Sequence, residues 1–284
     1  MSVPNLLHPI ELIKRKIKPL LKFFSLDNIT SKVGRPSELT SEDSIAFGLY
    51  KQQNGIPTKK SVWKTFQPVI PNVSYKVFVD SLNRNSKVIL ALLLCILKVN
   101  RSQQHYIKHM DSTCVPVCKV KNAKYHKTMK GIAGWGHSGD GFYFGVKLHL
   151  IADFMDKMQS VVFTSGNVSD KDVDTVLKLA KEITGLTIAD SGYVSEKLRL
   201  TFNKLNRMLL VKPYKNMKKI ATPLQNLLYG TRMMIEKHFR CLKLFFGLVT
   251  SMPRSITGYF ANYFYALTAY QLSAMELPAL PGVK

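Results

Sequence analysis

The stretch "HYIKHMDSTCVPV", residues 105–117, alternates between side chains of different polarity as it approaches Asp111. This period of two is typical of a β-strand, in which successive side chains point to opposite faces of a sheet. Asp111 lies in the middle of the expected strand, where an unpaired charged side chain is rarely buried. The stretch therefore predicts a strand that carries a functional carboxylate, and the rest of the chain can be arranged around it.

The segments that follow extend this strand into a sheet. Residues 141–153 and 156–166 are rich in aromatic and β-branched side chains and complete a three-stranded meander. Two further strands, 186–190 and 207–214, alternate with helices. The predicted helices are 168–185, 195–206 and a last one that contains Glu236. The order β-β-β-α-β-α-β-α predicts an α/β, ribonuclease H-like catalytic domain over residues 104–275, with a mixed five-stranded sheet and flanking helices. Residues 119–140 are expected to form an exposed loop.

Residues 1–100 have a helical pattern. Apolar residues recur at helical spacing in 8–24, and 41–55 starts with a Ser/Glu/Asp cap and ends at a glycine. Shorter helices are expected in 58–67 and 74–87. Short basic helices joined by tight turns favour a helix-turn-helix domain that binds DNA ends, but a purely structural helical bundle has the same pattern. Residues 276–284 are expected to be a tail.

Composition limits the class of protein. The chain of 284 residues is 46% hydrophobic, which is enough to fill a core, and its net charge of +23 points to a polyanionic partner. The most apolar run, 88–99, is too short to span a bilayer and is expected to be a buried helix. No secretion signal is recognisable, so we expect a cytoplasmic protein without a membrane partner.

The four cysteines contain no C-x-x-C pair. Cys114 and Cys118 have the spacing of one strand face. The spacing favours buried thiols over a zinc site or a disulfide.

Three carboxylates stand out by their surroundings. Asp111 is the only acid between Asp80 and Asp140, and Glu236 is the only acid between Lys197 and Arg254. Asp190 ends a strand that should pair beside the strand of Asp111, and the helix of Glu236 should pack across both. Converging carboxylates repel one another unless a cation separates them, and an all-oxygen set favours Mg²⁺ or Mn²⁺, with two ions expected.

Two of the three acids also have an ordinary interpretation. Asp190 precedes Ser-Gly-Tyr and resembles a turn former, and Glu236 has the spacing of a solvated helix partner of Arg232 or Arg240. Three further acids are expected to complement the dipole at the start of the helix over 168–185. They are Asp170, Asp172 and Asp174.

The stretch "YGTRMMIEKHFRCLK", residues 229–243, carries a resemblance to a known family. Its Tyr229, Arg232, Glu236 and Lys243 are similar to the Y-R-E-K signature of the insertion sequence 4 superfamily of bacterial transposases. The stretches "MDSTCVPVCK", "GFYFGVKLHL", "TSGNVSDKD" and "ADSGY" most resemble the insertion sequence 982 family. The resemblance covers about residues 105–272. Ala189 departs from it, since relatives usually have glycine before the second aspartate.

This resemblance implies a DDE triad of Asp111, Asp190 and Glu236 that holds the metal ions. It implies that Tyr229, Arg232 and Lys243 contact DNA. The expected function is to bind terminal inverted repeats, cleave DNA and transfer the strand to target DNA. Double-stranded DNA would be the partner, and a homodimer would join two ends. No small-molecule cofactor is expected. The protein would be associated with the bacterial nucleoid. A nuclease or junction resolvase of the same fold, or a decayed DNA-binding copy, are the alternatives.

Overall fold

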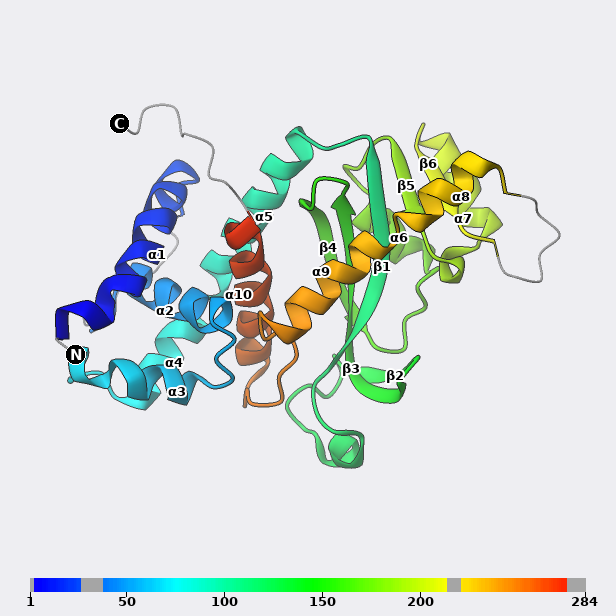
Figure 1. The fold of residues 1–284 in the computed structure, drawn as a ribbon. Coiled ribbons are helices and arrows are strands. Elements are labelled where there is room, and N and C mark those ends of the chain that lie inside the picture. The colour runs from blue at the N-terminus through cyan, green and yellow to red at the C-terminus, as the bar shows by residue number, and fades with distance from the viewer. Residues whose placement is uncertain (1–2, 27–37, 214–220, 275–284) are drawn as a thin grey trace. The chain divides into compact units, whose positions relative to one another are not determined.

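The computed structural model describes residues 3–26, 38–213 and 221–274 (Figure 1). The chain divides into two compact units, which are described separately. The first comprises residues 1–96 and 242–284, and the second comprises 97–241.

The first unit is entirely helical in its described part. Its helices begin where the sequence provides caps: Thr40 and Asp43 form a capping box, and Thr58 and Ser74 accept backbone N–H groups of the helices that follow them. The helices are α1 (Val3–Phe23), α2 (Ser41–Gln53), α3 (Lys59–Phe66), α4 (Tyr75–Arg84), the first part of α5 (Ser86–Ser102) and α10 (Ile256–Ala274).

Helix α10 completes the core of this unit although it comes from the far end of the chain. Its Ala261, Tyr265 and Ala269 lie in one buried apolar cluster with residues of α1, α2 and α4. The Gln52 side chain donates to the backbone carbonyl of Asn262 and to its side-chain oxygen, each at 2.9 Å. The expected catalytic domain over 104–275 therefore differs from the observed division, because α10 buries its apolar surface among the N-terminal helices.

This packing gives a stability prediction at Gly48 in α2. A Cβ atom at this position would lie 2.3 Å from the ring of Tyr265. We expect Gly48→Ala to lower the free energy of unfolding by about 1–3 kcal/mol, because the ring is fully packed and cannot withdraw. Chemical denaturation measures the change. Gly139→Ala is the control, since nothing lies within 4 Å of a Cβ there. An unchanged Gly48→Ala variant would contradict the placement of α10.

The expected helix-turn-helix stays a prediction. Helices α3 and α4 form where the sequence predicts them, but residues 67–74 separate them and include a short 3₁₀ helix, Gln67–Val69. This connection is longer than the turn of about three or four residues in that motif.

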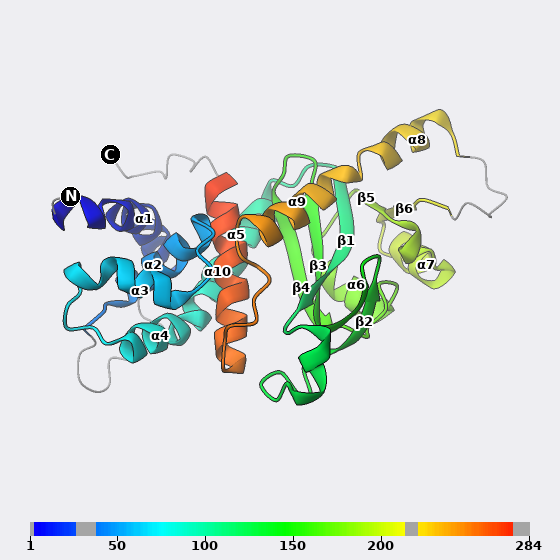
Figure 2. The same cartoon turned by 60° about the horizontal axis from the view of Figure 1, so that its bottom comes forward.

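The second unit is built on a six-stranded mixed sheet (Figure 2). β1 pairs antiparallel with β3 and parallel with β5, β3 pairs antiparallel with β4, and β5 pairs parallel with β6. The order β4-β3-β1-β5-β6 is that of the ribonuclease H-like fold, which confirms the predicted fold class. The strands are β1 (Ile107–Pro116), β2 (Gly134–Ser138), β3 (Gly141–Asp153), β4 (Met158–Ser165), β5 (Leu186–Ala189) and β6 (Met208–Val211).

The sixth strand, β2, is an addition to the prediction. It pairs antiparallel with the first residues of β3, from Gly134 opposite Gly145 to Ser138 opposite Gly141. A 3₁₀ helix, Val120–Tyr125, precedes it. Residues 119–140 are thus structured in part. Their glycines masked the strand in the sequence, because glycine has low strand propensity.

The two faces of the sheet carry different helices. Met110 of β1 lies in a buried cluster with residues of α6 (Val173–Leu179) and α7 (Glu196–Lys204). The preceding residue, His109, points to the opposite face, where its Nε2 lies 2.8 Å from Oγ1 of Thr231. Thr231 connects α8 (Pro223–Gly230) to α9 (Met233–Leu244). Asp111 is two residues after His109 in the same strand, so its side chain points to the same face of the sheet, toward α9.

The apolar run 88–99 forms part of α5, which confirms the predicted helix; half of these residues are buried, whereas Leu94 is 50% exposed. Across the described part of the chain, no helix has the length and apolar character needed to cross a membrane. None of the four cysteines forms a disulfide.

Candidate active site

Asp111 and Asp190 lie beside each other on neighbouring parallel strands. The last residue pair between β1 and β5 joins Met110 to Ala189, and each aspartate follows directly after it. Neighbouring strands are about 4.8 Å apart, so the two carboxylates start from adjacent backbone positions. The sheet register thus brings together two residues that are far apart in the sequence.

In each aspartate, one carboxylate oxygen accepts the backbone N–H of the next residue, and the other oxygen faces Arg232. Oδ1 of Asp111 accepts the N–H of Ser112 at 2.8 Å, and Oδ1 of Asp190 accepts the N–H of Ser191 at 2.7 Å. The two Oδ2 atoms face the same nitrogen of Arg232, at 4.0 Å from Asp111 and 2.8 Å from Asp190. The carboxylates are therefore oriented toward a shared cation position.

Glu236 reaches the same guanidinium from α9. Its Oε1 accepts from Nη2 of Arg232, four residues earlier in the chain. The expected partnership of Glu236 with Arg232 is present, but Arg232 also binds the aspartates, so this is more than a solvated helix pair. The structure thus gathers Asp111, Asp190 and Glu236 around Arg232.

The charge at this position is unbalanced. One guanidinium faces three carboxylates, and burial raises the pKa of Asp111 to about 7, with Asp190 and Asp170 acting in the same direction. The N–H of Ser112 and the charge of Arg232 oppose this rise. An ionised Asp111 would be stabilised by further positive charge.

The arrangement and chemistry of the three carboxylates show whether they could bind a metal ion. Among the described residues, no group of three or more His, Cys, Asp or Glu side chains is arranged closely enough to hold an ion. The guanidinium of Arg232 lies where the carboxylate oxygens converge. The oxygen-only donor set, the excess of negative charge and the two pre-oriented Oδ2 atoms fit a hard divalent cation such as Mg²⁺ or Mn²⁺.

Asp170 is a further acid near the site whose role the sequence did not indicate. Its Oδ1 accepts from Oγ of Ser112 at 2.5 Å and from Nζ of Lys147 at 3.0 Å. It was expected to lie at the start of a helix, but α6 begins at Val173 and its cap is Asp172, which accepts the N–H of Thr175. Lys147 could have indicated this role from the sequence, because a lone cation inside the apolar stretch of β3 needs an acidic partner.

The other two predicted residues, Tyr229 and Lys243, come before and after Arg232 and Glu236 in the sequence. Tyr229 is the penultimate residue of α8, and its hydroxyl donates to the backbone carbonyl of Val211 at 3.0 Å. Helix α8 ends at Gly230, so Arg232 lies in the connection to α9 and Tyr229 and Glu236 belong to different helices. Lys243 is half-buried near the end of α9, seven residues after Glu236.

Comparison with known proteins identifies the family. The family model described as "Transposase DDE domain" matches residues 101–256, which is more than half of the chain. This match ends where α10 begins. No curated protein matches the chain in sequence.

Several solved structures resemble the chain distantly. One is a cryo-EM structure of the piggyBac transposase synaptic complex with hairpin DNA, at 10% identity, with a TM-score of 0.47, covering 96% of this chain and 80% of that one. A pre-cleavage Mos1 transpososome has 10% identity and a TM-score of 0.27, with coverage of 92% and 86%. A Mos1 mariner paired-end complex with Mn has 11% identity, a TM-score of 0.27 and the same coverage.

The family assignment rests on the sequence match and not on these distant similarities. With three carboxylates brought together on a ribonuclease H-like sheet, the chain belongs to the family of transposases with a DDE domain.

Proposed function

We propose that this transposase is encoded by a bacterial insertion sequence most like the insertion sequence 982 family and moves that element in the nucleoid. It would bind the terminal inverted repeats, hydrolyse a phosphodiester to free a 3′-hydroxyl and direct this hydroxyl at a phosphorus of target DNA. The target bond to phosphorus breaks as the new one forms, and the displaced target oxygen leaves as a hydroxyl. The observation that carries this proposal is the convergence of Asp111, Asp190 and Glu236 on Arg232.

Each side chain has a part in this proposal. Asp111, Asp190 and Glu236 would hold Mg²⁺ or Mn²⁺, and two such ions would neutralise the phosphodiester and polarise its attacking and leaving oxygens. The N–H groups of Ser112 and Ser191 keep each aspartate in one orientation, which lowers the cost of ordering the site when DNA binds. Arg232 would then bind a phosphate oxygen of the DNA, since its guanidinium already lies among the three carboxylates.

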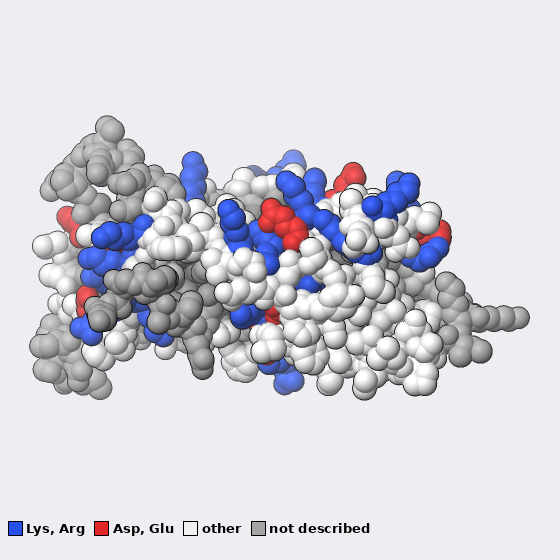
Figure 3. Space-filling model, turned by 90° about the horizontal axis from the view of Figure 1, so that it is seen from above, with Lys and Arg blue, Asp and Glu red and all other residues white. Residues whose placement is uncertain are grey.

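The charge of the protein supports DNA as the partner. On the face drawn in Figure 3, Lys and Arg side chains cover parts of both units, with fewer Asp and Glu among them. With a net charge of +23, binding should depend steeply on salt, because each phosphate contact releases condensed counterions. The ring of Tyr229 and the ammonium group of Lys243 are proposed to contact DNA near the scissile bond. The helices of residues 1–100 are proposed to bind the DNA ends, and a homodimer would hold two ends together.

A requirement for divalent metal is the first prediction from this proposal. We expect cleavage of inverted-repeat DNA to be lost in excess chelator and restored by Mg²⁺ or Mn²⁺, because three converging carboxylates need additional positive charge to bind a phosphodiester. Gel electrophoresis of a labelled duplex measures the fraction of DNA that is cleaved. Full cleavage in chelator would exclude the proposed role of the triad.

Strand transfer distinguishes a transposase from a nuclease or resolvase of this fold. Supplying pre-cleaved end DNA with a free 3′-hydroxyl, together with a target plasmid, should give a covalently joined product. The control is the same DNA with a 3′-dideoxy end, which has no nucleophile. Cleavage of intact ends without any joining would favour a nuclease, and binding without either reaction would favour a decayed copy.

A further inference from the structure

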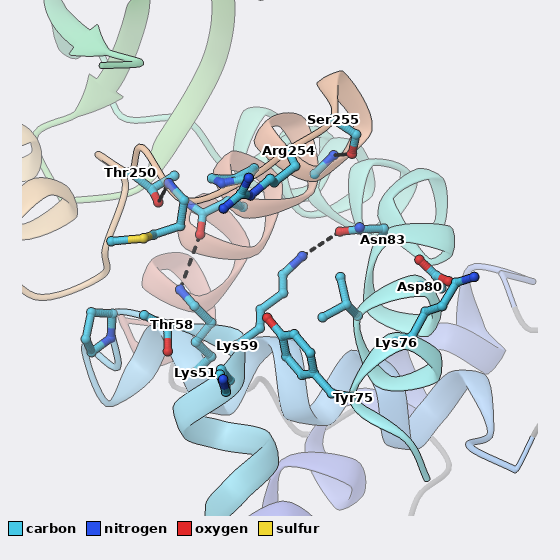
Figure 4. Close-up of a pocket in the computed structure, with 17 residues that line it drawn as sticks. Lys51, Thr58, Lys59, Tyr75, Lys76, Asp80, Asn83, Thr250, Arg254 and Ser255 are labelled. Carbon is cyan, nitrogen blue, oxygen red and sulfur yellow. Dashed lines mark hydrogen bonds between the residues drawn. The ribbon is translucent and has the colours of Figure 1, made fainter. Parts of the chain in front are cut away.

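A cavity of about 610 Å³ lies within the helical first unit, between α3, α4 and the chain around the start of α10 (Figure 4). Its size is that of pockets that bind small organic ligands. Five cationic side chains line it, together with one acid, Asp80. The cations are Lys51, Lys59, Lys60, Lys76 and Arg254.

The two most enclosed cations have only neutral partners in the described structure. Nζ of Lys59 donates to Oδ1 of Asn83 at 2.5 Å. Nζ of Lys51, a residue only 5% exposed, donates to Oε1 of Gln52 at 3.0 Å and to Oδ1 of Asn262 at 3.3 Å. Amide oxygens satisfy the donors but do not neutralise the charge.

No carboxylate of the described residues pairs directly with these cations. Within the described ranges, none of the five forms an ion pair. Burial lowers the pKa of both Lys51 and Lys59 to about 8. The charge of Lys59 adds to the lowering at Lys51, whereas the charge of Asp80 opposes it at Lys59. The ammonium group of Lys59, partly buried and close to the charge of Lys51, would be stabilised by an anion that enters the cavity.

The backbone adds to this positive potential. Three helices start at the cavity: Thr58 and Lys59 belong to the start of α3, Tyr75 to that of α4, and Ser255 caps α10 by accepting the N–H of Gly258. The positive ends of their dipoles therefore point toward the same space. In Figure 4, Lys59 and Arg254 extend into this space from opposite walls.

One wall is aromatic. Tyr75 is 39% exposed, and its ring packs against Trp63 with centroids 5.7 Å apart. Nε1 of Trp63 donates to the carbonyl of Val73 at 2.8 Å, which fixes this pair. A rigid, accessible aromatic ring beside a cationic cavity can stack on a nucleobase.

We propose that this cavity binds a nucleotide, with its phosphate between Lys59 and Arg254 and its base against Tyr75. The nucleotide is either free or part of a DNA strand that enters the cavity. The proposal rests on the proposed function only in that DNA is one source of the nucleotide. It requires no catalysis, so the two can fail independently.

The test measures binding to the full chain in chelator, so that no cleavage occurs. The probes are inorganic pyrophosphate, a deoxynucleoside monophosphate and a short single-stranded oligonucleotide, each titrated by calorimetry. We expect Arg254→Gln and Lys59→Gln to weaken binding about tenfold each, as for the loss of a hydrogen bond to a charged group. Arg254 is exposed, so its variant tests the proposal even if Lys59→Gln lowers stability.

Three further variants separate this site from general attraction to basic protein. Asp80→Asn should tighten binding, because it removes the one acid of the lining. Tyr75→Leu should weaken the mononucleotide and leave pyrophosphate unchanged. Lys87→Gln is the matched control: this lysine is exposed on α5 outside the cavity, and the binding of both small probes should not change.

The outcomes also identify the source of the nucleotide. Tight binding of the mononucleotide with this pattern of variants indicates a free nucleotide. Binding of the oligonucleotide alone, with the same pattern, indicates a DNA strand. If Arg254→Gln and Lys59→Gln bind every probe as Lys87→Gln does, the proposal is wrong. Glu236→Gln should bind the small probes like the unchanged protein, whether or not it cleaves DNA.

Discussion

Replacement of Asp111 by asparagine is expected to abolish DNA cleavage while binding to DNA ends is largely retained. Asp190→Asn and Glu236→Gln should do the same. Each amide keeps the shape of the side chain but removes a negative charge that a divalent ion needs as a ligand. We expect the cleavage rate to fall on the order of a thousandfold or more, as when a principal electrostatic contact to the transition state is removed.

The structure separates this effect from a loss of folding. Oδ1 of Asp111 only accepts a backbone N–H, which an asparagine oxygen can also accept. Because burial already disfavours the charged form of Asp111, the neutral amide should not lower the free energy of unfolding. Cleavage is measured on labelled duplex, end binding by fluorescence anisotropy and stability by chemical denaturation.

Asp172→Asn is a matched control for the three variants. Asp172 caps α6 on the other face of the sheet, and asparagine is an equally good cap. Its cleavage rate should stay close to that of the unchanged protein. Undiminished cleavage by any one of the three triad variants would refute the assignment of that residue.

The sheet and its two aspartates could be predicted from the sequence because they depend on local patterns. Alternation in residues 105–117 set which face of β1 carries Asp111, and a strand ending at Asp190 needed only the parallel pairing of β5 to bring the two together. Both are consequences of the period of two in a strand. The order of elements then allowed one α/β topology of the ribonuclease H type.

What the sequence did not predict depends on contacts between distant segments. Helix α10 is apolar on nearly all sides, so its pattern could not show that α2 is its neighbour. Asp170 lies in an acidic stretch, and the sequence pattern predicts that it belongs to the helix start, although only Asp172 and Asp174 do. The break of α8 at Gly230 placed Arg232 in a connection, from which its guanidinium reaches all three carboxylates.

The position of Arg232 leads to the second large expected effect. Arg232→Ala should lower the cleavage rate by about a hundredfold, because the guanidinium would otherwise hold a phosphate beside the scissile bond. The affinity for Mg²⁺ or Mn²⁺ should not fall, and it should rise if the guanidinium competes for the Oδ2 atoms of Asp111 and Asp190. An isothermal titration with Mn²⁺ measures this second quantity without any cleavage.

Lys243→Ala provides a comparison on the same helix. It lies two turns beyond Glu236, so we expect it to lose most cleavage through a phosphate contact while metal affinity stays unchanged. Each of the two variants should reduce the salt slope of DNA binding by about one. Lys178→Ala, which removes an exposed cation from α6 on the other face of the sheet, should cleave normally.

The two measurements together decide what Arg232 does. A guanidinium that only pairs with carboxylates would, when removed, change metal affinity and leave the salt slope unaltered, since no phosphate contact is lost. A guanidinium that only binds DNA would change the slope and leave metal affinity unaltered. If Arg232 passes from the carboxylates to a phosphate as DNA and metal bind, metal affinity and the salt slope must both change in Arg232→Ala. Arg232→Lys should then recover the salt slope better than the cleavage rate, because an ammonium group supplies the charge but not the planar fork of donors.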